Sequence, residues 1–439
     1  MKGLWSGPAF RLGLLVGGLS ALQRWVLWAV YAPVTYGDTG SYFRSAEVLS
    51  RWTLADYDGT RVPGYPAFIA LFGLDPDRVY AAQLVLGWLI TLLLYWWAWQ
   101  ATRRPVLGAI VAFGYTLIPG QFLFEANLLT ETLTAFLLVL SFVLNFAVER
   151  SATSPRQLLA AAGLGLSAGA VGLVRILFYP LSVWLIPFVW TAIGDGWRMR
   201  LSRTAVFLVP AFVLLMGWVG YINSAYGFLA PTTMGGYNLV QHTGVFFEYL
   251  PDEYAAIRDT YLRYRAARLA ERGDQTNTIW EAIPELTEVS GFGFYDLSRE
   301  LQRLSLLLIR QHPDLYLRNV AEGWLGFWKA PVYWDPALVS HPAAASILRA
   351  WAAVGRAVSL TVNAGFLAIS LWVILRLRRY RELLRDRAWL APWGFIWFTS
   401  VVQTIVDHGD NPRFLVPLQA VVFFVVVIAA DFVYRKERK

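Results

Sequence analysis

Long apolar stretches constrain this chain more than any other feature of its sequence. Several run for about 18 residues or more without a charged side chain, and each is long enough to cross the ~30 Å hydrocarbon core of a bilayer. The composition agrees, because 57% of the residues are hydrophobic and only 15% are charged, against about 25% charged residues in soluble domains. The sequence therefore predicts an all-α polytopic membrane protein.

We predict about ten transmembrane helices, within a range of about eight to twelve. One part of the assignment is open, because residues 157–193 fit either two spans or one span followed by a re-entrant piece. The predicted spans cover residues 12–31, 79–101, 105–124, 127–148, 157–177, 179–193, 204–222, 352–375, 388–406 and 413–434.

Basic residues gather in alternate loops between these spans. The strongest clusters are RLRRYRELLRDR at 376–387 and RKERK at the C-terminal end, whereas the chain outside the whole set of these alternate loops is richer in acidic than in basic residues. Since loops rich in Lys and Arg stay in the cytoplasm, both termini are predicted to lie there, in a plasma (inner) membrane. The same bias accounts for the net charge of +8, so no nucleic-acid partner is needed.

The predicted topology divides the chain into three parts. Residues 1–222 form an N-terminal transmembrane module, whose first external loop at 32–78 carries helices that lie on the membrane surface. Residues 223–350 form an external region, and residues 351–439 form the C-terminal transmembrane helices.

The external region is predicted to be helical. Residues 251–273 begin with Pro and acidic side chains and end in Gly, as a capped helix does. Residues 294–331 are amphipathic, with a break near His312 and Pro313.

Three charged residues fall inside predicted spans. Arg24, Glu131 and Arg175 all lie toward the outer leaflet on this topology. Charges in hydrocarbon are costly and are by default functional. The alternative is a buried ion pair that only fixes the packing of the helices.

Matching polar groups lie in the external loops. The first loop holds Asp38 and Arg61, and Glu125 precedes the fourth span. The loop before the last span reads DHGDNPRF, at residues 407–414. Arginines of this kind bind an anionic lipid phosphate, and a carboxylate beside them can accept a proton.

Each of these features also has a structural explanation. Asp38 is in position to cap a helix at 39–51, since Asp is a preferred N-cap residue. Arg61 can satisfy carbonyl groups at the RVPGYP turn, and the DHGDNPRF charges can form a solvated loop tip. Asp407, His408 and Asp410 are a weak candidate for a metal site, in a chain with no Cys and only four His. We therefore predict no metal site.

These motifs, taken in order along the chain, resemble the C-type glycosyltransferase superfold, the membrane enzymes that use polyprenyl-phosphate-linked sugars. The resemblance is nearest to the protein O-mannosyltransferase and aminoarabinose-transferase group. It rests on a first span with an Arg, followed by GDTGSYFRSAEVLSRW and RVPGYPAFIALFG, then EANLLTETLTAFLLVL and NPRFLVPLQAVVFFV. It covers residues 10–222 and 388–430.

The resemblance implies an inverting transfer of a sugar from polyprenyl phosphate to a hydroxyl of a glycan, lipid or protein. Asp38 would be the general base, and fixed cations would stabilise the leaving phosphate. No cofactor is expected to be required, although a divalent metal is possible. The implied donor-phosphate ligands are Arg24, Arg61, Arg175 and Arg413. The implied sugar or acceptor contacts are Tyr42, Tyr65, Glu125, Glu131, His408 and Asp410.

The sequence departs from the family pattern in the first loop. The family's first motif is often Asp-Glu, whereas here it is Gly37-Asp38-Thr39. A lysine that some relatives place in this loop is absent, and Arg61 is the candidate substitute.

Two other functions compete with this interpretation. A lipid or glycan flippase would show related halves and polar residues near the bilayer midplane, and the sequence shows neither. An enzyme of the O-antigen ligase or polymerase type would also act externally through arginine, but on a pyrophosphate-linked glycan.

Overall fold

The computed structural model describes residues 7–151, 153–192, 196–406 and 411–438. Helices dominate these ranges, and the β-type pairing within them consists of two isolated bridges, from Tyr31 to Val339 and from Val34 to Asn127. The predicted all-α fold is confirmed.

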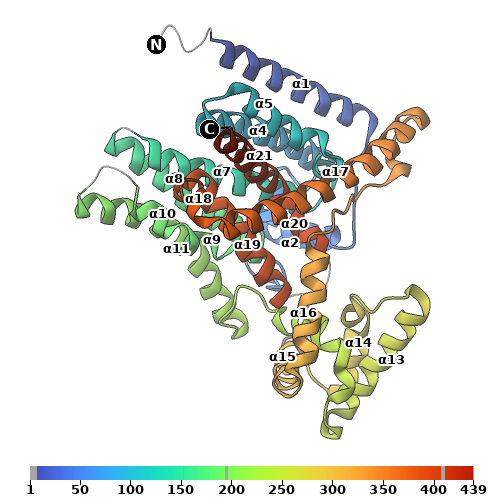
Figure 1. The fold of residues 1–439 in the computed structure, drawn as a ribbon. Helices are drawn as coiled ribbons and strands as arrows, with labels where there is room; N and C mark the ends of the chain where they lie inside the picture. Colours follow the sequence, from blue (N-terminus) through green and yellow to red (C-terminus); the bar gives the residue numbers. More distant parts are fainter. Residues whose placement is uncertain (1–6, 152, 193–195, 407–410, 439) are drawn as a thin grey trace. The chain divides into compact units, whose positions relative to one another are not determined.

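Eight helices in the described ranges are long and apolar enough to cross a membrane. Figure 1 shows how these helices follow one another along the chain. They are α1 (Pro8–Val30), α4 (Pro76–Thr102), α7 (Glu131–Arg150), α8 (Ser154–Val174), α11 (Trp197–Tyr226), α17 (Pro342–Leu375), α19 (Arg387–Val406) and the C-terminal segment Pro412–Glu437, which contains α20 (Asn411–Leu415) and α21 (Gln419–Glu437).

A ninth candidate span is broken. Helix α5 (Pro105–Leu117) is followed, after a bend of 64°, by the short helices at Pro119–Ala126. Pro119 supplies no backbone N–H and so cannot continue the hydrogen-bond ladder of α5. The last turn, η1 (Leu123–Ala126), carries Glu125.

The predicted span at 179–193 is not a single helix. It consists of α9 (Leu181–Trp184) and α10 (Ile186–Trp190), which follow Pro180 and contain Pro187. The prolines interrupt the ladder at both places. The eight or nine spans thus lie within the predicted range but below the predicted ten.

The chain forms two compact units. The first comprises residues 1–217, 330–397 and 415–439, and the second comprises residues 218–329 and 398–414. The first unit holds α1 to α10 and most of the spans. The predicted placement of region 223–350 outside the membrane stays a prediction.

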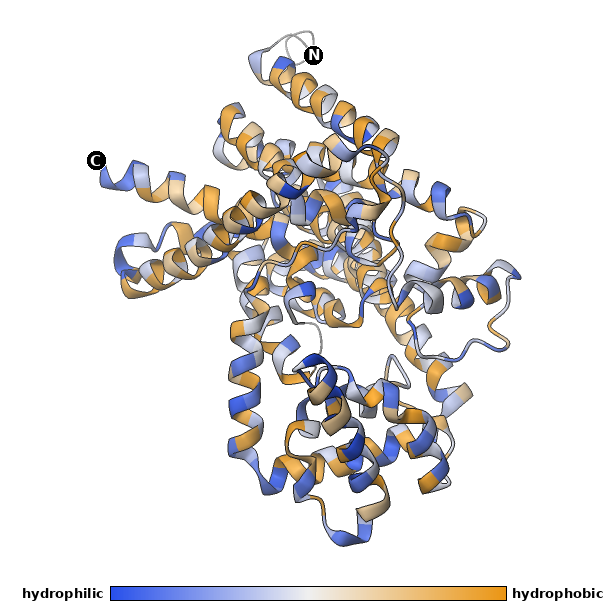
Figure 2. Cartoon of the chain, turned by 90° about the vertical axis from the view of Figure 1, so that its right-hand side faces the viewer, coloured by the Kyte–Doolittle hydropathy of each residue, from blue (hydrophilic) through white to orange (hydrophobic). Residues whose placement is uncertain are grey.

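Apolar residues cover the spans of the first unit. Figure 2 shows this for α21 at the end of the chain, which is hydrophobic along most of its length and becomes hydrophilic toward the C-terminus. Within this unit α4 packs against α1, α5 and α7. Gly87 of α4 makes one close approach possible, because a Cβ there would overlap the carboxylate of Glu125.

The second unit contains a small helical core of its own. Helix α15 (Phe294–Gln311) buries four leucines at helical spacing, Leu297, Leu301, Leu304 and Leu308, against α12 (Gly235–Thr243) and neighbouring helices. The predicted helix at 251–273 is confirmed, since α13 covers Ala255–Arg272 and ends at Gly273. The predicted break is confirmed as well, because α16 (Pro313–Phe327) starts a new helix after His312.

Candidate functional site

Asp38 occupies the position before α2 (Thr39–Ser50), but its carboxylate does not cap that helix. Its backbone carbonyl instead accepts from the Ser41 amide at 3.1 Å and from the Ser41 hydroxyl at 2.7 Å. The carboxylate accepts from Arg61 Nη2 at 2.6 Å. The capping explanation is thus wrong for the side chain, which an arginine engages.

Arg61 is held in place by α2. Its Nε donates to the Ser41 hydroxyl at 2.9 Å, and its guanidinium carbon lies 4.9 Å from the centre of the Tyr42 ring. A planar guanidinium can make both contacts at once, which a lysine ammonium cannot. The side chains of Arg61 and Asp38 remain 27% and 34% exposed, so the pair is open to an outside molecule.

Tyr42 and Tyr65 lie beneath this pair and are buried. Their rings pack edge to face at 5.2 Å, and the Tyr65 hydroxyl donates to Gln83 Oε1 at 2.8 Å. Burial, together with the nearby charge of Glu131, raises the pKa of Tyr65 well above its usual value. These two tyrosines pack against the pair from within, and their predicted contact with a sugar stays a prediction.

Arg24 forms a second ion pair, inside the helix bundle. Its Nε and Nη2 bind both carboxylate oxygens of Glu125 at 2.8 and 2.6 Å. Its Nη1 donates to the Ser20 carbonyl at 3.2 Å and also contacts the Ser20 hydroxyl. The side chains of Arg24 and Glu125 are 4% and 0% exposed. This arrangement joins α1 to η1 and directs the guanidinium inward.

Arg175 and Glu131 form the third pair. Glu131 is the first residue of α7, and Arg175 follows the last residue of α8 in an extended conformation. Arg175 Nη1 lies 3.0 Å from Glu131 Oε1, and the two side chains are 10% and 1% exposed. The predicted intramembrane charges are thus paired, with Glu125 as the partner of Arg24.

Neutral residues connect these pairs, and the sequence prediction missed them. Gln83 donates to the carbonyls of Glu125 and Asn127 at 3.0 and 2.8 Å, in addition to holding Tyr65. The Thr39 hydroxyl donates to the Leu128 carbonyl at 3.1 Å. A polar amide within an otherwise apolar predicted span was the available signal for Gln83.

The chain returns to the same place after residue 329. In this return segment, residues 330–340, the Leu338 carbonyl accepts from the Ala32 amide at 3.2 Å. The Ser340 amide donates to the Val30 carbonyl at 2.9 Å. Asn127 Nδ2 donates to the Tyr333 carbonyl at 3.1 Å. The loop before Asp38 is therefore held by two distant parts of the sequence.

The remaining predicted site residues belong to a different part of the chain. Arg413 lies in α20, within the second unit, and its side chain is partly buried. His408 and Asp410 lie outside the described residues. Among the residues that are described, no group of three or more His, Asp or Glu side chains could hold a metal ion. Independence from a cofactor stays a prediction.

Comparisons with known proteins give similarities of fold. No protein-family model matches the chain, and no curated protein matches it either. Two crystal structures of ArnT from Cupriavidus metallidurans are similar to it, each over 95% of this chain and 77% of that one. The structure bound to undecaprenyl phosphate has 14% identity and a TM-score of 0.40, and the apo structure has 13% and 0.38.

A third similar structure is the archaeal oligosaccharyltransferase AglB from Archaeoglobus fulgidus, in complex with an inhibitory peptide and a dolichol-phosphate. The identity is 14% and the TM-score 0.48, over 99% of this chain and 51% of AglB. These are proteins of the class that the sequence resembles. Similarity at this level does not assign an activity to the chain, whose fold is that of an all-α multi-pass membrane protein.

Proposed function

We propose that this protein is a glycosyltransferase that moves a sugar from a polyprenyl-phosphate donor to an acceptor hydroxyl. The observation that best supports this is the Asp38–Arg61 pair, which is partly exposed at the start of α2, whereas the other two pairs are buried. The reaction takes place at the extracytoplasmic face of the plasma (inner) membrane, as the distribution of basic loops predicts.

Asp38 is the general base in this proposal. The acceptor oxygen bonds to the anomeric carbon as the bond from that carbon to the donor phosphate breaks. The acceptor proton passes to the Asp38 carboxylate, and polyprenyl phosphate leaves. Attack from the side opposite the leaving group inverts the anomeric configuration.

Arg61 connects donor binding to the base. Its Nη2 donates to the Asp38 carboxylate at 2.6 Å. A phosphate group is a competing anion that suits the guanidinium fork, and it gains charge as the bond breaks. When Arg61 turns to the phosphate, the Asp38 carboxylate can accept a proton.

Not all of the other predicted arginines are retained as phosphate ligands in this proposal. We keep Arg175 as a further phosphate ligand because its side chain retains some exposure beside Glu131. The role of Arg413 stays a prediction from the sequence. We leave Arg24 out of this set because Glu125 and Ser20 occupy Nε, Nη1 and Nη2. Glu125 and Glu131 then act by holding their arginines and the surrounding backbone.

The test of the base is Asp38→Asn in purified, reconstituted protein, assayed with a panel of polyprenyl-phosphate-linked sugars. We expect it to bind polyprenyl phosphate and unfold like wild type, but to transfer sugar at least about 100-fold more slowly, as loss of a general base does. Transfer at the wild-type rate would reject Asp38 as base.

Asp56→Asn is the matched control. Asp56 is an exposed carboxylate in the same loop, and its φ of 67° is one that Asn adopts readily. This variant should transfer sugar like wild type.

The corresponding test of Arg61 is Arg61→Lys, which should weaken binding of polyprenyl phosphate because an ammonium point charge lacks the forked donor geometry of the guanidinium.

A further inference from the structure

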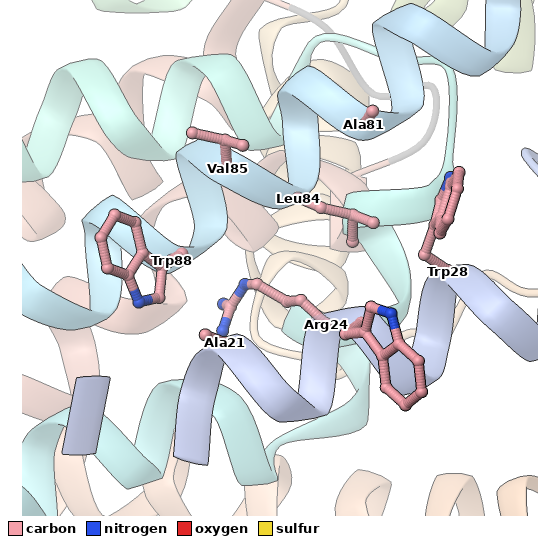
Figure 3. Close-up of a pocket in the computed structure, with 8 residues that line it drawn as sticks. Ala21, Arg24, Trp28, Ala81, Leu84, Val85 and Trp88 are labelled. Atoms are coloured by element: carbon pink, nitrogen blue, oxygen red, sulfur yellow. The ribbon is translucent and has the colours of Figure 1, made fainter. Parts of the chain in front are cut away.

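An apolar groove lies between α1 and α4, away from Asp38. Its volume is about 360 Å³. Figure 3 shows Trp88 and Trp28 toward opposite ends of the lining residues, with Arg24 between them. The groove is lined by Ala21, Arg24, Trp25, Trp28, Ala81, Leu84, Val85 and Trp88.

Arg24 is the one ionisable residue of this lining, and its charge is paired with that of Glu125. Glu125 neutralises the guanidinium and accepts two hydrogen bonds from it, and the Ser20 carbonyl accepts another from Arg24 Nη1. The one charge that borders the groove is therefore compensated, and the rest of the lining is uncharged.

The groove is also preformed. The Trp88 indole N–H donates to the Gly17 carbonyl at 3.0 Å, which fixes this ring against α1. Ala21 and Ala81 leave space because each ends at its Cβ atom. A ligand would not have to displace either helix. The protein therefore loses little conformational entropy when the ligand binds.

We propose that this groove binds an acyl chain of a bilayer phospholipid. Both walls belong to apolar spans, so the groove opens at the level of the hydrocarbon core. Water finds too few polar partners on such a wall to be held there. An uncharged hydrocarbon chain is complementary to a wall whose only charge is neutralised. This site does not depend on the glycosyltransferase activity.

The experiment uses the full chain in vesicles of phosphatidylglycerol and phosphatidylcholine, with a small fraction of phosphatidylcholine that carries a photoactivatable acyl chain. After illumination, the labelled residues are mapped by peptide mass spectrometry. Labelling should concentrate on the groove residues and exceed that of Leu14 and Leu15, which are exposed on α1 but do not line the groove.

The groove can be filled without changing charge. Ala81→Phe and Ala21→Phe each place a ring in the space, and labelling at Trp25 and Trp28 should fall at least about fivefold. Ala29→Phe is the matched control, because Ala29 is exposed on α1 outside the lining set. It should leave the labelling unchanged. Two different filling variants keep the test valid if one of them does not fold.

Several outcomes would overturn the proposal. Even labelling of all exposed residues of α1 would indicate ordinary bilayer contact. Unchanged labelling in both filling variants would show that the chain lies elsewhere. Displacement of the label by one equivalent of polyprenyl phosphate would assign the groove to that lipid.

Discussion

The ion pair of Arg24 and Glu125 lies inside the helix bundle and is almost completely buried. Removing one partner of such a buried pair destabilises a protein much more than removing both, because the single remaining charge is left uncompensated. We expect Glu125→Gln to lower the free energy of unfolding by about 3–5 kcal/mol. The measurement is unfolding of the purified protein in mixed micelles with increasing denaturing detergent.

The double variant, Arg24→Met with Glu125→Leu, is the internal comparison. Apolar replacement of a whole buried pair is often neutral, so this variant should be more stable than Glu125→Gln. If the double variant were the less stable of the two, the pair would contribute more than charge compensation. Its role would then include the bonds from Arg24 to Ser20.

Charged residues were the part of the site that the sequence could predict. Arg24, Glu131 and Arg175 each stand out against an apolar background. Asp38 and Arg61 lie in the polar first loop, where the motifs around them drew attention to them. Which acid pairs with which arginine depends on contacts as distant as 101 residues in sequence, so spacing could not supply it. Among the neutral residues, Gln83 carried a weaker signal of the same kind, as an amide within an apolar span, and the prediction missed it.

At the level of elements, the close approach of α4 to η1 depends on Gly87. A methyl group at this position would overlap the Glu125 carboxylate, which Arg24 fixes in place. We expect Gly87→Ala to destabilise the protein by about 1–3 kcal/mol, the usual cost of overpacking. The same detergent unfolding measures it.

Gly18→Ala provides the control on a neighbouring span. Its added Cβ meets nothing within 4 Å, so the higher helix propensity of Ala should leave stability unchanged or slightly raised. Equal losses in the two variants would mean that backbone flexibility, and not the approach to Glu125, is what the glycines provide.

The sequence predicted long, uninterrupted helices better than short ones. The spans α1 and α4 fall within a few residues of where apolar length alone places them, whereas α17 begins ten residues before the predicted 352. The segment 179–193 is equally apolar, but Pro180 and Pro187 divide it into α9 and α10. Hydropathy records how well a segment partitions into lipid, and it does not record a missing backbone donor.

For the whole molecule, the testable quantity is orientation in the membrane. The chain has no cysteine, so a single introduced one reports its own side. Exposed positions suit this test, and we choose Glu271→Cys on α13 and Arg378→Cys in the basic loop. The positive-inside rule predicts that an impermeant thiol reagent added outside intact cells labels the first and not the second.

Disruption of the cells should make the second cysteine reactive, which controls for burial. Labelling of both cysteines from outside, or of the second alone, would contradict the predicted topology. It would also move Asp38 away from the side on which the proposed donor is used.

The return segment imposes an order of events on synthesis. Val30 and Ser340 are 310 residues apart, and their backbones are hydrogen-bonded. At about 5–20 residues per second, a ribosome reaches Ser340 on the order of 15–60 s after Val30. During that interval the loop that carries Asp38 has none of its contacts with the return segment. A chain released early, before residue 330, would contain the complete Asp38–Arg61 pair and still lack the backbone partners that hold the preceding loop.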